Sequence, residues 1–303
     1  MLTGTPLDAT PFGPLLSLLG LAYWAVAIGI VVLTLLLVKP RWPRYILAAA
    51  IAGSFFVPVA RSGLAHYQAA QELERRREAA TALFKERCIT AGERIHRTVD
   101  KVDGVVWLKW RSDRSDSEDQ FALDDFYGRD CAGEECVANL LRVSEGANLN
   151  PAEATRHAAG FEYVETIYPD GQKYRYSAYL SSWTARQAEA HRSMTGQDPP
   201  ITSHRFSLRR ERIADFTARY GVLWADVSTR HDRENWITGG SLKVIDLETQ
   251  EILAERVGYL ADPGLGDTGG FRAPWAWASS YGPRCPEAVR RTRDFVLQAL
   301  VPR

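Results

Sequence analysis

The chain has 303 residues, of which 46% are hydrophobic and 24% are charged, a composition that supports a substantial core and excludes disorder as the dominant state. Its 37 Lys and Arg residues balance 37 Asp and Glu residues, so the formal net charge is zero. Such a chain has no global field that would draw it to nucleic acid, and no nucleic-acid partner is expected. Arg outnumbers Lys by 31 to 6, which is typical of a GC-rich and hence bacterial genome.

A run of 25 residues without a charged side chain extends from Pro14 to Val38. At about 1.5 Å per residue, a helix of this length exceeds the roughly 30 Å hydrocarbon core of a bilayer. A cleaved signal peptide has a basic leader and a shorter apolar stretch, whereas the first 38 residues contain no Lys or Arg. The sequence therefore predicts a first membrane span at 14–38, preceded by a short outer-side tail, residues 1–13.

A second apolar run, 45–60, is short for a span but follows the first at hairpin distance. The intervening KPRWPR contains two prolines that stop helix propagation, together with three cations, which flank spans mainly on the cytoplasmic side. We therefore expect two transmembrane helices, within residues 14–61, joined by a cytoplasmic turn. Both chain termini are then expected on the periplasmic side of a bacterial inner membrane. The cations at Arg61 and Arg75–Arg77 count against this orientation, although acidic residues are interleaved with the second group.

Residues 64–99 are expected to form one long membrane-proximal helix. Apolar residues from Leu73 to Val99 recur at three-, four- and seven-residue spacing, which gives an apolar stripe along one side of such a helix. The charged run ELERRRE is expected to face solvent on the other side. The helix then acts as a stalk between the spans and the rest of the chain.

All four cysteines lie outside the apolar runs. An even set in the water-soluble part is typical of disulfides formed in an oxidising compartment, and three pairings are possible. We favour Cys131 with Cys136, which closes the short loop CAGEEC, and Cys88 with Cys285, which ties the membrane-proximal helix to the end of the chain. Four unpaired thiols are the alternative, and the spacing fits a structural zinc site poorly.

Residues 100–303 are expected to form one periplasmic α+β domain. Strand patterns occupy 104–110, the two arms of a hairpin around the turn Pro169-Asp170-Gly171, 219–230, 235–247 and 251–260. Consecutive strands favour a mostly antiparallel sheet over parallel βαβ units. A short helix is expected at 181–194, a long ordered loop at 261–286, and a C-terminal helix from Glu287 to about Leu300.

No familiar motif identifies a catalytic class, because the phosphate loop, the nucleophile elbow and the HExxH zinc motif are all missing from the sequence. No cofactor or metal is expected. The strongest catalytic candidates are His231, Asp232 and Glu234 in the segment STRHDRENW, since a carboxylate can hold a histidine in the tautomer that a general base needs. A solvated hairpin loop is the favoured explanation of the same segment.

Two tryptophans, Trp275 and Trp277, flank Ala276 in the expected loop. Exposed aromatic side chains would form a contact surface for a protein or a glycan, because they bury a large area at low entropic cost. Burial in the core is the equally weighted alternative. The aspartate-rich segments DDFYGRD and DPGLGDTGG fit turn chemistry better than a calcium loop.

These features together favour a non-enzymatic, inner-membrane-anchored protein whose periplasmic domain binds another protein. An immunity protein against a secreted toxin and an envelope-assembly factor both fit that layout. A periplasmic hydrolase that uses His231 with Asp232 or Glu234 is the alternative. A third hypothesis is a structural subunit of a membrane complex, in which small residues such as Gly20 and Gly29 allow the spans to pack closely on partners.

Overall fold

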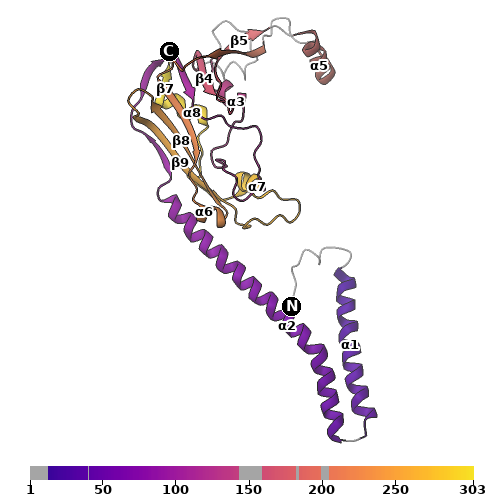
Figure 1. Ribbon diagram of the computed structural model, residues 1–303. Helices are drawn as coiled ribbons and strands as arrows, with labels where there is room; N and C mark the ends of the chain where they lie inside the picture. Colours follow the sequence, from indigo (N-terminus) through magenta and orange to yellow (C-terminus); the bar gives the residue numbers. More distant parts are fainter. Residues whose placement is uncertain (1–12, 40, 143–158, 182–183, 199–204) are drawn as a thin grey trace. The chain divides into compact units, whose positions relative to one another are not determined.

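The computed structural model describes residues 13–39, 41–142, 159–181, 184–198 and 205–303. The predicted outer-side tail therefore lies outside the described residues except for Gly13, and so does Pro40 of the predicted turn. The chain divides into two compact units, Met1–Arg75 and Arg76–Arg303 (Figure 1).

The first unit contains helix α1 (Gly13–Leu37) and most of helix α2 (Arg41–Cys88), which run side by side as a hairpin (Figure 1). Aromatic rings join them edge to face, with Tyr23 at 5.5 Å from Phe55 and Trp24 at 5.2 Å from Phe56, measured between ring centroids. Both helices are long and apolar enough to cross a membrane. The predicted pair of apolar helices is present.

Helix α2 continues through Pro58. Proline has no N–H to donate and its ring crowds the preceding turn, so the backbone hydrogen bonding is interrupted there. The Tyr23 hydroxyl of α1 donates to the carbonyl of Phe55 at 2.9 Å, three residues before this proline. This hydrogen bond joins the two helices one residue from Ser54, whose carbonyl loses its N–H partner at the proline.

The second apolar run, 45–60, and the first part of the expected membrane-proximal helix over 64–99 lie on one continuous helix of 48 residues, α2. This helix ends at Cys88 rather than at the expected residue 99. Gly92 has a φ of 151°, and the residues that follow it pair with strand β9 as strand β1 (Gly92–Ile95). The spacing that ends at Val99 fits a helix, but cross-strand pairing outweighs that local pattern.

The second unit is an α+β domain. Its further strands are β2 (Val99–Val102), β3 (Gly104–Trp107), β4 (Tyr163–Ile167), β5 (Lys173–Ser181), β6 (Arg205–Ile213), β7 (Tyr220–Asp226), β8 (Ile237–Asp246), β9 (Ile252–Ala261), β10 (Arg284–Cys285) and β11 (Leu300–Pro302). Its helices are α3 (Glu134–Ala138), α5 (Ala185–Thr195), α6 (Arg230–Glu234), α7 (Pro274–Tyr281) and α8 (Thr292–Ala299).

Nine strands of the described chain form one sheet in the order β1-β9-β8-β7-β3-β4-β5-β6, with β10 also paired to β9, while β2 and β11 form a separate parallel pair. The predicted hairpin is β4 with β5, and the predicted meander is β7, β8 and β9, all antiparallel. Strand β3 is the exception, because it pairs in parallel with both β4 and β7. The sheet is therefore mixed, though mostly antiparallel.

Helices α3 and α8 cover one face of this sheet. Val137 of α3 and Phe295 of α8 are fully buried against strand residues that include Val222 and Val244. Side chains alternate between the two faces of a strand, so Lys243 and Glu255 lie on the opposite face, where they form an ion pair at 3.0 Å. The domain is thus a sheet whose main helical layer lies on one side.

Several local elements differ from the sequence-based expectations. The segment expected as a solvated hairpin loop contains the short helix α6, and the expected long loop at 261–286 contains helix α7. The C-terminal helix begins at Thr292 instead of Glu287 and is followed by β11. Strand β6, at one end of the sheet, was not expected at all.

Candidate functional site

Strand β6 forms one edge of the nine-stranded sheet and is nine residues long. Every residue from Arg205 to Ile213 pairs with β5, and this register has no bulge. Because β6 is the last strand in the described sheet, the polar backbone groups on its outer side have no strand beside them in that part of the chain. Such a row of donors and acceptors is a template for pairing with another chain.

The side chains of β6 are strongly basic where they are described. Arg209, Arg210 and Arg212 are exposed, with Glu211 as the single acidic residue among them. Alternation places Arg210 and Arg212 on the face that carries Tyr174 and Tyr176, and Arg209 on the other face. Positive charge therefore borders the open edge on both sides of the sheet.

Arg210 belongs to a polar network at this edge. Its Nη1 donates to the Tyr168 hydroxyl at 3.2 Å and lies 3.8 Å from Oε1 of Glu134 on α3. The Tyr176 hydroxyl donates to the same Glu134 oxygen at 2.9 Å and also contacts the Tyr168 hydroxyl. Burial and the hydrogen bond with Tyr168 raise the pKa of Tyr176, so this phenol stays neutral. The network fixes Arg210 in place beside Arg209 and Arg212, which are exposed and form no ion pair with the described residues.

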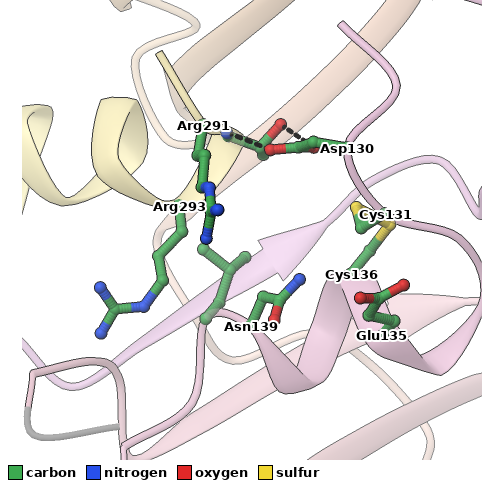
Figure 2. Close-up of a pocket in the computed structure, with 9 residues that line it drawn as sticks. Asp130, Cys131, Glu135, Cys136, Asn139, Arg291 and Arg293 are labelled. Carbon is green, nitrogen blue, oxygen red and sulfur yellow. Dashed lines mark hydrogen bonds between the residues drawn. A yellow bond between two sulfur atoms is a disulfide. The ribbon is translucent and has the colours of Figure 1, made fainter. Parts of the chain in front are cut away.

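Figure 2 shows a second feature, a pocket of about 350 Å³ between α3 and the start of α8. Arg291 and Arg293 lie on one side of it, and Glu135 with the disulfide Cys131–Cys136 lies on the other. The lining therefore carries charges of both signs and does not select an anion or a cation.

Asp130 in this pocket serves the fold. Its carboxylate accepts hydrogen bonds from the backbone N–H of Thr292 at 2.6 Å and from the Thr292 hydroxyl at 2.7 Å, so it caps α8. Arg293 donates to the carbonyl of Ala159. The Thr292 hydroxyl and the Asp130 carboxylate are both engaged in this cap.

The predicted catalytic residues do not converge. The His231 side chain is 69% exposed, and its Nδ1 lies 4.0 Å from Glu234 Oε2, one helical turn away. Asp232 is buried, and its carboxylate accepts from the N–H and the hydroxyl of Thr229 at 2.8 Å each and from Arg87 Nε at 2.8 Å. Asp232 therefore caps α6 and holds the end of α2 instead of orienting His231.

Trp275 is fully buried, so the prediction that it forms an exposed contact surface is wrong. Its ring packs against Phe126 and Trp236, and its Nε1 donates to the carbonyl of Asp119 at 2.8 Å. Trp277 is half-buried, with the guanidinium of Arg272 at 4.3 Å from its ring. Both tryptophans belong to helix α7 instead of a loop, and they lie at different positions around that helix. Their side chains therefore have different surroundings.

The cysteines are joined in the pairs that the sequence favours. Cys88 is bonded to Cys285, and Cys131 is bonded to Cys136, with Cα–Cα distances of 5.5 and 5.0 Å. The first bond fixes the end of α2 to β10, and the second closes the loop beside α3. Two disulfides are consistent with an oxidising compartment.

The aspartate-rich segments form ion pairs with arginines. Asp125 is buried beside Arg111 at 3.4 Å and accepts from the N–H of Gly128 at 2.7 Å. Burial raises the pKa of Asp125 in spite of these partners. Asp262 pairs with Arg272 in the same manner. Among the described residues no group of three or more His, Cys, Asp or Glu side chains is arranged to hold a metal ion.

Sequence reasoning missed β6. The sequence pattern that marks this strand is an alternation of apolar and polar residues, with Phe206 and Leu208 on one face. Arg210 and Arg212 occupy the next two positions on that face and end the apolar pattern. A period of two that changes from apolar to charged halfway is typical of a strand that leaves the core and continues as an exposed edge.

No known protein family, curated protein or solved structure matches this chain.

Proposed function

We propose that this chain is a protein-binding module anchored in a bacterial inner membrane, with its α+β domain in the periplasm. The observation that carries the proposal is β6, a nine-residue edge strand with exposed arginines and no strand beside it in the described sheet. An edge of this length is rare on a protein that stays alone, because it invites pairing. An immunity protein that intercepts a secreted toxin and an envelope-assembly factor both require such a surface.

The anchor and the disulfides support the location. Two helices are long and apolar enough to span a membrane, and the cations around Trp42 favour a cytoplasmic turn. Both disulfides belong to the unit that follows the spans. Disulfides persist in the periplasm and are rare in the cytoplasm, so the domain is assigned to the outer side.

The test is capture of the partner in the native cell. The full-length protein is tagged at its C-terminus, crosslinked in place and purified in detergent. We expect one soluble or secreted protein to be purified together with the tagged chain, in an amount nearly equal to that of the chain. A matched control carries the same tag on residues 1–75, the hairpin unit. Recovery of no stoichiometric protein with the full chain contradicts the proposal.

A second candidate function, a subunit of a membrane complex, has its own observation. A Cβ atom added at Gly20, Gly29 or Gly53 would meet no atom within 4 Å, so the hairpin leaves open space at all three glycines. Small residues at a helix surface allow another membrane helix to approach closely. This candidate expects membrane proteins to be captured by residues 1–75 as well as by the full chain, which separates it from the binding module.

A further inference from the structure

We propose that β6 binds an acidic, extended segment of the partner protein, which adds to the sheet as a further strand beside β6. The inference rests on the proposed function and names the chemistry of the partner. It follows from three features of the edge: its length, its regularity and its charge.

The length and regularity of β6 make strand addition feasible. All nine residues keep an unbroken antiparallel register with β5, so the outer backbone groups are presented at the regular spacing of a sheet. The strand contains no proline, which would remove a donor, and no bulge, which would twist the edge away. Addition of a strand uses these backbone groups for affinity and the flanking side chains for specificity.

The charge of the edge selects the occupant. An added strand would place its side chains directly beside Arg209 on one face and beside Arg210 and Arg212 on the other. Opposite charges in such cross-strand positions stabilise the pair, and like charges destabilise it. Glutamate or aspartate on both faces of the incoming segment therefore fits, and a basic segment does not.

The same charge argues against a second copy of this chain. The antiparallel register that pairs all nine residues of two β6 strands sets Arg209 directly against Arg209. An in-register parallel pair sets each arginine against its own copy. Exposed charges thus protect the edge from self-association while they leave it open to an acidic strand.

The arginines are available for this role. Among the described residues, the Arg209 guanidinium lies 5.4 Å from the centre of the Tyr179 ring and forms no ion pair, and Arg212 forms no ion pair or hydrogen bond. Arg210 is held by Tyr168 and Glu134, and its hydrogen bonds with Tyr176 and Tyr168 raise its pKa. The edge is thus lined by one cation held by hydrogen bonds and by two that form no ion pair with the described residues.

The direct test uses a fluorescent peptide and the full-length protein in detergent. The probe is a capped nonapeptide of threonine and valine with three central glutamates, and its binding is followed by fluorescence anisotropy. Two matched peptides carry three lysines in place of the glutamates, or the same glutamates with every central backbone nitrogen methylated. We expect both to bind at least about tenfold more weakly, since one reverses the charge and the other removes the backbone donors.

Variants locate the binding on β6. Arg209→Glu with Arg212→Glu is expected to weaken binding of the acidic peptide about tenfold, and Arg209→Lys with Arg212→Lys is expected to retain most of it. The control is Arg94→Glu with Arg114→Glu, which changes the charge equally at exposed arginines elsewhere, one of them on the opposite edge strand β1. Near-ultraviolet circular dichroism checks that each variant keeps the fold.

Several outcomes overturn the inference: equal binding of the methylated and unmethylated acidic peptides, equal loss in the β6 and control variants, or no binding of the acidic peptide. They are distinguishable from failure of the proposed function. If the full chain captures a partner in cells and the Arg209→Glu, Arg212→Glu variant captures it equally, protein binding stands and the role of β6 is wrong. If no partner is captured with either chain, the proposed function itself fails.

Discussion

The Arg87 Nε atom lies 2.8 Å from Oδ1 of Asp232, and this ion pair joins the last turn of α2 to the short helix α6. The hydrogen bond to Asp232 raises the pKa of the Arg87 guanidinium, which therefore stays charged. The next residue, Cys88, is bonded to Cys285. Two neighbouring residues thus hold the end of α2 to the domain, one by charge and one by a covalent bond.

Replacement of Asp232 by Asn is expected to destabilise the domain by about 1–3 kcal/mol, because the buried carboxylate accepts three hydrogen bonds and the amide can replace only part of them. Urea unfolding of the full-length protein in detergent, followed by tryptophan fluorescence, measures the loss. The control is Glu234→Gln on the same helix, where the exposed side chain predicts a change within about 0.5 kcal/mol. Similar effects of the two substitutions would contradict the structural role of Asp232.

The two disulfides are expected to contribute unequally to stability. Cys88–Cys285 spans 197 residues and Cys131–Cys136 spans 5, so loop-closure entropy predicts contributions of roughly 5 and roughly 2 kcal/mol. Paired Cys→Ser variants of the full chain, unfolded thermally without reductant, should show the larger fall in melting temperature when the long loop is opened. A larger fall in melting temperature on loss of Cys131–Cys136 would contradict stabilisation by restriction of the unfolded chain.

The lowered pKa of Glu165 is expected to make the stability of the domain depend on pH. Burial alone would raise the pKa of this fully buried carboxyl, but the N–H groups of Ala218 and Thr217 and the guanidinium of Arg175 hold the pKa below its usual value of 4.5. The native state therefore binds fewer protons than the unfolded state. The stabilising effect is complete above about pH 4.5 and is lost as the pH falls through the lower native pKa.

The measurement is the free energy of unfolding of the wild type and of Glu165→Gln between about pH 3 and about pH 7. The wild type should be more stable by a constant amount above about pH 5, and the difference should shrink as the solution becomes more acidic. A difference that stays constant down to about pH 3 would show that the native carboxyl has no lowered pKa.

The proposed orientation in the membrane predicts which positions a membrane-impermeant maleimide reaches. Single cysteines replace Trp42 and Leu123, which are 83% and 80% exposed, in the predicted cytoplasmic turn and in the domain respectively. In cells whose outer membrane is made permeable, the cysteine at position 123 should be labelled, and the cysteine at 42 should react only after lysis. The opposite labelling would place the domain in the cytoplasm.

Features that depend on neighbours in the sequence were predictable. The length of the first apolar run, ending at Val38, is enough to indicate the long apolar helix α1, and the turn Pro169-Asp170-Gly171 marks the β4–β5 hairpin. The end of α2 was not predictable, because Val99 continues a helical spacing while the chain beyond Gly92 pairs with a strand about 160 residues later in the sequence. The parallel pairing of β3 with β7 also joins strands that are far apart in the sequence, so no local pattern indicates it.

The candidate site depends even more on tertiary structure. His231 and Asp232 are adjacent in sequence, but the helical backbone of α6 leaves one exposed and buries the other under Arg87. Trp275 lies in a segment rich in glycine and proline, yet α7 carries it into a cluster with Phe126. The open edge at β6 becomes visible only when the order of the strands is known.

The most direct test of the account is site-specific photocrosslinking from β6 in living cells. A photoreactive residue replaces Glu211, which is exposed on that strand, and in a second chain it replaces Glu118, which lies outside the sheet. Binding of a partner at β6 predicts one discrete crosslinked protein from position 211, lost with Arg209→Glu and Arg212→Glu, and none from position 118. The same products from both positions, or none from position 211, would contradict binding of a partner protein at this edge.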